Sequence, residues 1–196
     1  PTVDVSARCL SFLAQAGFER DHPVIARGLA YVRQEQEPDG SWFGRWGTNY
    51  IYGTWSALCA FNACGEDPMA PHIRKAVEWL KGFQQSDGGW GEGGETYWTE
   101  RKDFVRESTP SQTAWAVLGL MSIGEVESPA VKRGIEYLLR APRTGTKWHE
   151  DWYTAVGFPR VFYLRYHGYP KFFPLWALAR YRNLRNTNSR VVGVGM

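Results

Sequence analysis

The stretch Gln84-Gln85-Ser86-Asp87-Gly88-Gly89-Trp90 is a turn that ends one of three similar segments in this chain of 196 residues. Before it, residues 73–80 carry apolar side chains at positions i, i+3, i+4 and i+7, the pattern of an amphipathic helix that buries one face. Serine, aspartate and glycine then break the helical pattern. The stretch therefore predicts a helix followed by a tight turn that carries a tryptophan.

Two further segments align with this one without gaps. Residues 25–32 lead to a turn that ends at Trp42, and residues 131–138 lead to a turn that ends at Trp148. The first copy of the turn keeps the glutamine, aspartate, glycine and tryptophan, whereas the third copy, which begins at Pro142, keeps only the tryptophan. A repeat of roughly fifty to sixty residues is typical of stacked helical units.

More apolar helical segments alternate with these three amphipathic ones. They are centred on residues 7–13, 55–61, 115–121 and 175–178. The first three end near Gly17, Gly65 and Gly124, glycines suited to helix C-caps, and Pro110 and Pro129 fall where helix starts are expected. Because no alternating β pattern competes, we predict an all-α fold of about seven helices, with the more apolar helices as an inner layer and the amphipathic ones as an outer layer.

The composition indicates a soluble globular domain that is rich in rings. The chain is 43% hydrophobic, 22% charged and 15% aromatic, so either the core or a pocket is lined with aromatic side chains. The three cysteines and four histidines lack the spacings of a disulfide framework or a metal site, and no apolar run is long enough to span a membrane. Without an initiator methionine or signal peptide, the chain is expected to be a piece of a longer protein.

The C-terminal end of the chain has a strong excess of positive charge. Residues 152–196 contain no Asp or Glu, but seven basic residues: Arg160, Arg165, Lys171, Arg180, Arg182, Arg185 and Arg190. This asymmetry would allow an anionic membrane surface or a nucleic acid as a neighbour, although a solvated basic tail is the simpler interpretation. The glycine-rich polar loop at residues 91–106, which includes Glu92, is also interpreted as solvated surface.

The repeated turns resemble the Gln-Trp repeats of the triterpene cyclases. The resemblance extends through Phe43-Gly44-Arg45-Trp46-Gly47, Gly157-Phe158-Pro159 and Phe162-Tyr163-Leu164-Arg165-Tyr166, and the last two stretches are most similar to squalene-hopene cyclases. It implies the C-terminal third of such an enzyme, half of an α/α toroid barrel with alternating inner and outer helices. Residues 1–186 would be the C-terminal half of the catalytic barrel domain, and residues 187–196 a flexible tail.

The same resemblance implies an isomerase that works without a metal or an organic cofactor. Enzymes of this family protonate squalene with an Asp of a D-x-D-D motif and guide the resulting cation to hopene or hopanol. No D-x-D-D occurs in this chain, and the family pattern puts it upstream of Pro1, so the chain alone is expected to be inactive. The whole protein would be a peripheral enzyme on the cytoplasmic side of the bacterial inner membrane.

The partners implied are squalene and an anionic membrane surface, with no nucleic acid. Because half a barrel leaves an apolar face uncovered, the isolated chain could also form a homodimer.

Seven positions match residues that have roles in this family. Arg8 matches the His or Arg that hydrogen-bonds the catalytic Asp, and Tyr52 matches a Tyr whose hydroxyl supports the proton relay. The five expected substrate-binding residues are Trp46, Phe158, Phe162, Tyr166 and Tyr169. Without the resemblance, an exposed arginine and buried core rings would be the ordinary interpretation of these residue types.

Aromatic rings suit this chemistry for a physical reason. A carbocation in a dry pocket needs stabilisation from a group that cannot trap it, and a ring face supplies negative potential without a lone pair. One such contact is worth about 2 kcal/mol when desolvated. Phe158 and Phe162 are four residues apart and would share one face if that stretch is helical.

Two other functions fit the sequence. One is a related cyclase with another polyprenoid substrate, such as oxidosqualene. The other is a non-catalytic helical-repeat module that binds a protein on its concave face. The second alternative expects a polar, charged inner face, whereas the predicted inner helices carry mainly Ala, Leu and Trp.

Overall fold

The computed structural model describes residues 1–187, and the predicted flexible tail lies outside the described residues except for Thr187. Within that part of the chain there are seven α-helices: α1 (Val3–Gln15), α2 (Pro23–Gln34), α3 (Tyr50–Ala63), α4 (Pro71–Gly82), α5 (Pro110–Ser122), α6 (Pro129–Arg140) and α7 (Tyr169–Asn186). Two 3-10 turns, η1 (Gly94–Tyr97) and η2 (Thr99–Arg101), lie between α4 and α5. The predicted all-α class and number of helices are confirmed.

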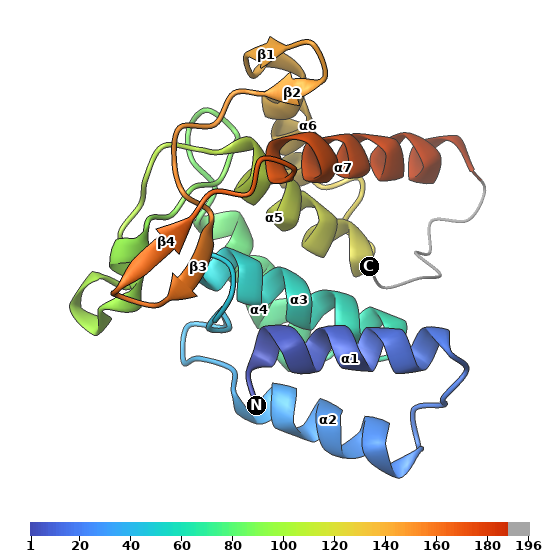
Figure 1. Cartoon of the computed structure of the whole chain (residues 1–196). Helices are drawn as coiled ribbons and strands as arrows, with labels where there is room; N and C mark the ends of the chain where they lie inside the picture. Colours follow the sequence, from blue (N-terminus) through green and yellow to red (C-terminus); the bar gives the residue numbers. More distant parts are fainter. Residues whose placement is uncertain (188–196) are drawn as a thin grey trace.

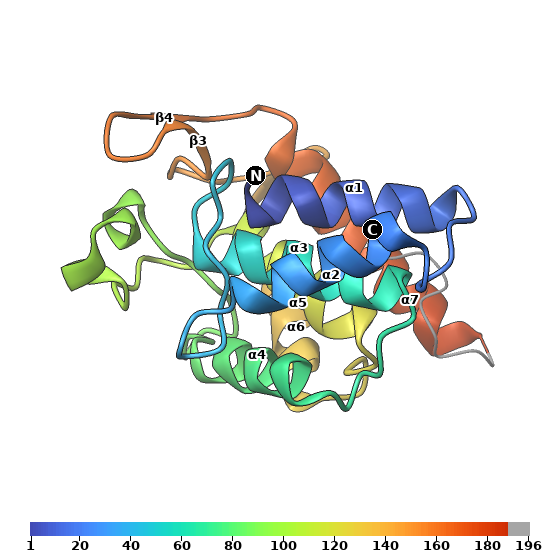
Figure 2. The same ribbon diagram turned by 90° about the horizontal axis from the view of Figure 1, so that it is seen from below.

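The helices form two layers, as the hydrophobic pattern predicts. Helices α1, α3, α5 and α7 pack against one another in that order and form the inner layer (Figure 1). Helix α2 packs on α1, α4 on α3 and α6 on α5, so each amphipathic helix covers the inner helix that precedes it (Figure 2). This alternation is half of an α/α barrel.

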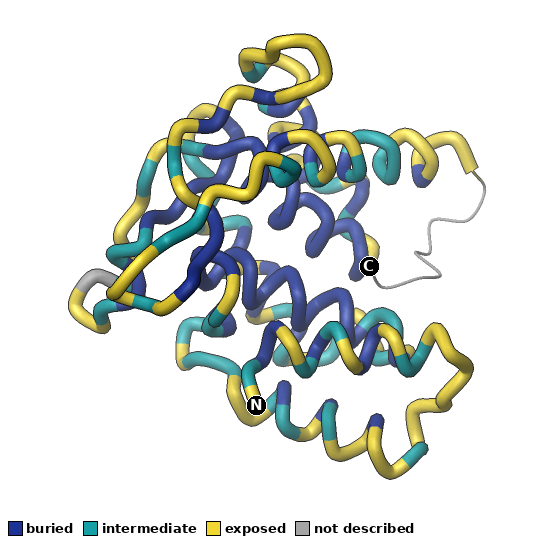
Figure 3. Tube along the Cα trace, in the orientation of Figure 1, coloured by how far each residue is buried: buried dark blue, intermediate teal, exposed yellow. Residues whose placement is uncertain are grey.

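The two central inner helices carry the core. Every residue of α5 is buried, and α3 is buried from Tyr50 to Phe61. The outer helices bury only one stripe; in α4 it consists of the four apolar positions that the sequence pattern predicts. Figure 3 accordingly shows continuous burial along α3 and α5, and alternating buried and exposed positions along α2. None of the described helices is both long enough and apolar enough to cross a membrane.

The predicted helix ends are also confirmed. Helices α5 and α6 begin at Pro110 and Pro129, where the missing proline N–H costs no helical hydrogen bond. Gly17, Gly65 and Gly124 follow inner helices with φ angles of 92°, 68° and 90°. A side chain would be strained in this left-handed conformation, which is why glycine ends these helices.

A buried tryptophan closes each outer helix by the same hydrogen bond. The indole nitrogens of Trp42, Trp90 and Trp148 donate to backbone carbonyls ten residues upstream, at 2.6, 2.8 and 2.8 Å. These carbonyls belong to the last turns of α2, α4 and α6, where no helical N–H remains to satisfy them. The three copies of the turn are therefore equivalent in structure as well as in sequence.

The glutamine of the turn ties one outer helix to the next. The side-chain amide of Gln36 donates to the carbonyls of Gly40 and His72, and that of Gln84 donates to those of Gly88 and Ala130. His72 and Ala130 are each the second residue of the following outer helix. In the third copy, Pro142 has no amide to donate, whereas helix α6 and the hydrogen bond of Trp148 remain.

Two short antiparallel hairpins interrupt the helical pattern. Strand β1 (Arg143–Thr144) pairs with β2 (Lys147–Trp148), and β3 (Ala155–Phe158) pairs with β4 (Phe162–Leu164). Phe158 and Phe162 face each other across the second hairpin, so the stretch is not helical and the condition under which they would share a helical face is not met. Pro159 restricts Phe158 to extended backbone, and the turn at Arg160 has a positive φ of 68°, so no helix continues through this stretch.

We predict that Trp90→Phe lowers the free energy of unfolding by about 1–3 kcal/mol, because the buried Leu80 carbonyl loses its donor. Chemical denaturation monitored by circular dichroism measures the change. Trp79→Phe is the matched control, since Trp79 is only half-buried on α4, where it stacks on Phe83. Equal losses in the two variants would contradict a special role for the repeat tryptophan.

Candidate functional site

The loop at residues 43–49 carries Trp46 and is fixed to the β3–β4 hairpin by backbone hydrogen bonds. Val156 N–H donates to the Trp46 carbonyl at 3.2 Å, and Thr48 N–H donates to the Thr154 carbonyl at 3.1 Å. The buried hydroxyl of Tyr97 donates to the Gly44 carbonyl of the same loop at 2.7 Å. Segments about a hundred residues apart in sequence thereby form one surface.

Arg8 and Tyr52, the two candidate catalytic residues, lie together on the inner face of the half-barrel. The guanidinium of Arg8, on α1, lies 5.3 Å from the ring centroid of Tyr52 and 4.6 Å from that of Trp55, both on α3. Both distances are in the range of cation–π attraction. The structure thus brings the two predicted residues into direct contact.

Two of the predicted substrate-binding tyrosines adjoin this pair. The rings of Tyr166 and Tyr169 are 4.9 Å apart, and Trp115 lies between Tyr169 at 5.8 Å and Tyr52 at 5.0 Å. These side chains come from α3, α5 and the start of α7, so three inner helices contribute to one aromatic cluster.

The hydroxyl groups of Tyr52 and Tyr169 keep their protons at neutral pH. Burial raises the pKa of Tyr52, although the charge of Arg8 and its hydrogen bond to the hydroxyl act in the opposite direction. Burial also raises the pKa of Tyr169 to about 12. Since arginine offers five N–H donors and no acceptor, this end of the face is built to receive an anionic or strongly accepting group.

The remaining predicted residues form a second group of exposed rings. Trp46, Phe158 and Phe162 are 48%, 59% and 44% exposed, and the two Phe rings are 5.4 Å apart. The alternative that these rings are ordinary core packing is therefore wrong within the described residues. Exposed apolar rings gathered in one place mark a surface that another group covers.

Gly47 joins the two groups. A side chain at Gly47 would come within 2.4 Å of the Tyr52 ring, so this ring packs directly on the loop backbone, one residue from Trp46. The donor-rich cluster and the exposed rings are consequently neighbours on one continuous face.

Sequence reasoning missed Trp55, on whose ring the Arg8 guanidinium lies, and the two rings that pack against it. Trp55 and Trp115 stack in parallel at 6.0 Å, and Phe173 of α7 packs edge-on against both at 5.5 and 5.4 Å. In the sequence these residues mark only apolar helices. Their aromatic character was the available signal, but it does not distinguish a core from a site.

The environment of Glu92 also differs from the one that the sequence predicts. It is 2% exposed, and one carboxylate oxygen accepts the backbone N–H groups of Asn49 and Ile51 at 2.7 and 2.6 Å. The interpretation of Glu92 as solvated surface is therefore wrong, because its buried carboxyl group accepts N–H groups at the start of α3 that have no helical partner. Glu150 does the same for Ser111 at the start of α5. Both follow a repeat tryptophan by two residues, a signal that the sequence did contain.

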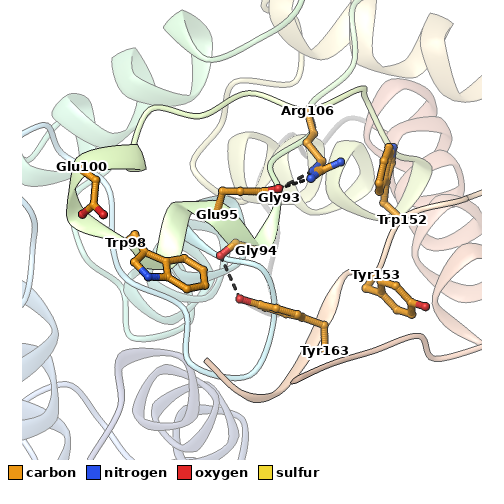
Figure 4. A pocket seen from close by; sticks show the side chains of 9 residues that line it. All are labelled: Gly93, Gly94, Glu95, Trp98, Glu100, Arg106, Trp152, Tyr153 and Tyr163. Atoms are coloured by element: carbon orange, nitrogen blue, oxygen red, sulfur yellow. Dashed lines mark hydrogen bonds and ion pairs between the residues drawn. The ribbon is translucent and has the colours of Figure 1, made fainter. Parts of the chain in front are cut away.

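Figure 4 shows a hollow of about 520 Å³ that is separate from these residues. Its walls come from residues 93–106 and from the segment before and within β3–β4. The aromatic residues that line it are Trp98, Trp152, Tyr153 and Tyr163. Arg106 pairs with Glu95 and lies 4.0 Å from the ring of Trp152. None of the seven residues singled out in the sequence lines this hollow.

Fold and face together define a class of protein: half of an α/α barrel in which the inner helices and the neighbouring loop and hairpin carry a cluster of aromatic side chains. Comparison with known proteins specifies the family. The family model of the squalene-hopene cyclase C-terminal domain matches residues 1–183, and the chain belongs to this family, as its motifs predict.

Three relatives illustrate the similarity. The squalene-hopene cyclase of Bradyrhizobium diazoefficiens is 61% identical over 100% of this chain and 30% of its own length. That of Zymomonas mobilis is 57% identical over the same shares. Dammaradiene synthase of Dryopteris crassirhizoma is 41% identical over 92% of this chain and 30% of its own length. The chain thus spans about 30% of the length of the curated relatives that it matches.

We predict that Glu92 makes stability depend on pH. Burial raises its pKa from the ordinary 4.5 to about 7, although the N–H donors at α3 oppose this. Because the folded state then holds the proton more tightly than the unfolded state, the contribution of Glu92 is fully present below about pH 4.5 and is lost as pH rises through 7. This loss of folding stability amounts to about 3 kcal/mol at most. Glu92→Gln keeps one oxygen acceptor and should remove this dependence of stability on pH.

Denaturant unfolding of wild type and variant between pH 4.5 and pH 8 measures this slope. Glu136→Gln, which changes an exposed glutamate on α6, is the control and should leave the slope as in wild type. The assignment fails if Glu92→Gln and wild type lose stability in parallel over this range.

Proposed function

We propose that the whole protein to which this chain belongs is a squalene-hopene cyclase, an isomerase that converts squalene to hopene or hopanol through cationic polycyclisation. One observation carries the proposal: Trp46, Phe158 and Phe162 present exposed rings together on one face. The names of the bacterial relatives support the same reaction. In this proposal the rings of Trp46, Phe158 and Phe162 form an aromatic wall that stabilises the cation. The acid comes from a D-x-D-D motif elsewhere in the protein.

The donor-rich cluster then serves the acid. A guanidinium near a carboxyl group favours the ionised form, so Arg8 would stabilise the carboxylate left after the proton is transferred. The Tyr52 hydroxyl, which burial keeps protonated, would donate to the same carboxylate or take part in returning the proton. Both residues would act at the start of the reaction.

The exposed rings serve the later stages. As the positive charge moves along the folding chain, ring faces lower its energy without forming a bond to it, which is preorganised electrostatic stabilisation. Tyr166 and Tyr169 would brace this wall, since their rings pack on each other and Tyr169 packs on Phe173 at 5.0 Å. The wall would therefore decide which product forms.

A second candidate function is the cyclisation of another polyprenoid, including oxidosqualene. The observation behind it is that dammaradiene synthase and the sporulenol synthase of Bacillus subtilis, each 41% identical to this chain, are named for products other than hopene. A protein-binding module is not favoured, because the inner helices α3 and α5 present buried tryptophans and aliphatic side chains. Product analysis with each substrate separates the two cyclase functions.

We place the whole enzyme on the cytoplasmic face of the bacterial inner membrane, because an apolar substrate such as squalene partitions into lipid. The basic residues of α7, including Arg182 and Arg185, support an anionic lipid surface as a partner. Phe12 on α1 and Phe172 and Leu175 on α7 are well exposed, and these apolar side chains would allow the isolated chain to dimerise. No nucleic acid and no cofactor enter the proposal.

We expect Phe162→Ala in the full-length enzyme to divert squalene to products with fewer rings. Loss of a ring contact of about 2 kcal/mol changes partitioning at the affected cation by about thirtyfold. Gas chromatography of the products measures the change, and Phe18→Ala, on the connection between α1 and α2, is the control. Hopene as the sole product at the normal rate would exclude the stabilising role of Phe162.

We also expect the 196-residue chain alone to form no hopene from squalene, because it contains no D-x-D-D acid. The same assay on the purified chain tests this, with the full-length enzyme as the positive control. Hopene formation by the chain would mean that another group within it donates the proton.

A further inference from the structure

We propose that Arg45, anchored by Asp4, is a positioning residue that holds the aromatic wall in place and so determines where cyclisation ends. This inference rests on the proposed cyclase function and extends it to residues outside the predicted site. The arginine links the loop that carries Trp46 to the hairpin that carries Phe158 and Phe162.

The side chain of Arg45 binds the backbone of the hairpin. Both terminal nitrogens of the guanidinium donate to the Gly157 carbonyl, each at 3.1 Å. The pairing of β3 with β4 shifts register between Val156 and Phe158, so Gly157 lies at a bulge, where the regular ladder is interrupted. Arg45 thus holds the irregular point of the hairpin, 112 residues away in sequence.

Gly157 is the position on which the Phe rings depend. A side chain there would come within 1.9 Å of the Phe162 ring, so Phe162 packs directly on the backbone that Arg45 holds. Phe158 is the next residue, and its ring lies 5.7 Å from the guanidinium. A movement of the Gly157 carbonyl therefore moves both rings.

The same guanidinium lies 4.3 Å from the ring of Trp46. Its planar shape lets it stack on this ring while its edge donates to Gly157, a combination that a lysine ammonium cannot reproduce. Because a fixed positive charge would repel a carbocation, the contribution of Arg45 is to orient rings and not to stabilise the cation directly.

Asp4 fixes the other end of the link. Its carboxylate is 1% exposed at the start of α1 and accepts the backbone N–H groups of Arg45 and Trp46 at 3.0 and 2.8 Å, while its second oxygen accepts that of Val5. A buried carboxylate with three charge-assisted hydrogen bonds is a rigid anchor. Asp4 therefore fixes the position of the wall relative to α1, the helix that also carries Arg8.

The test uses Arg45→Met and Arg45→Lys in the full-length enzyme with squalene. Methionine keeps the apolar stem but loses the donors, and we expect the ratio of early-terminated to complete products to rise on the order of tenfold. Lysine can restore one hydrogen bond and should give an intermediate ratio. Arg140→Met is the matched control, since exposed Arg140 on α6 also donates to a backbone carbonyl, that of Asp87.

A double variant separates positioning from general damage. If Arg45 acts through the rings, Arg45→Met combined with Phe162→Ala should give nearly the product ratio of Phe162→Ala alone, whereas independent effects would multiply. Thermal unfolding and total squalene consumption are measured for every variant. A changed product ratio at an unchanged melting temperature supports the role in positioning.

The outcomes are distinguishable. A wild-type product ratio in a folded Arg45→Met variant overturns the inference, as does a ratio that multiplies with that of Phe162→Ala. Should Arg45→Met not fold, Arg45→Lys decides by the same criterion. Failure of the wild-type enzyme to consume squalene overturns the proposed function itself, and Phe162→Ala then serves no longer as a reference.

Discussion

The hydrogen bond from a buried indole to the last turn of an outer helix is the contact on which the half-barrel depends. It recurs at Trp42, Trp90 and Trp148, each time satisfying a carbonyl that the end of the helix would otherwise leave without a donor. Where a glutamine precedes the turn, its amide also reaches the start of the next outer helix. One short motif thereby ends a helix, closes the joint over the core and sets the position of the following repeat.

Buried carboxylates give the same scaffold its second set of ties. Asp4, Glu92 and Glu150 each accept backbone N–H groups from a different segment, and two of them do so at the start of an inner helix, where a negative charge is favoured. Burial removes the carboxyl groups of Glu92 and Glu150 from water, and this desolvation raises the pKa of both. Asp4 on α1 thereby holds the loop that carries Trp46, while Glu92 and Glu150, which lie in loops, tie those loops to the starts of α3 and α5. Such ties suit a site that must keep its geometry.

The face itself separates two kinds of chemistry. Arg8 and Tyr52 supply N–H and O–H donors close to the central helices, whereas Trp46, Phe158 and Phe162 supply ring faces on the loop and hairpin. Donors stabilise an anion and ring faces stabilise a cation, so in the proposed function adjacent regions of one surface would stabilise the opposite charges that a proton transfer creates. The repeats form the scaffold, and the segments outside the repeat carry the rings.

The sequence by itself determined the helices, their two layers and the degenerate third turn, because hydrophobic period, glycine and proline act over a few residues. It also identified seven positions of the candidate face through resemblance to a family. The comparisons confirm that the chain belongs to this family. Only the tertiary structure decided that Phe158 and Phe162 face each other on a hairpin, that Glu92 is buried, and that Arg45 reaches Gly157. The positions of Glu92 and Arg45 depend on contacts between segments 41 and 112 residues apart, and no local pattern encodes which distant backbone a side chain will meet.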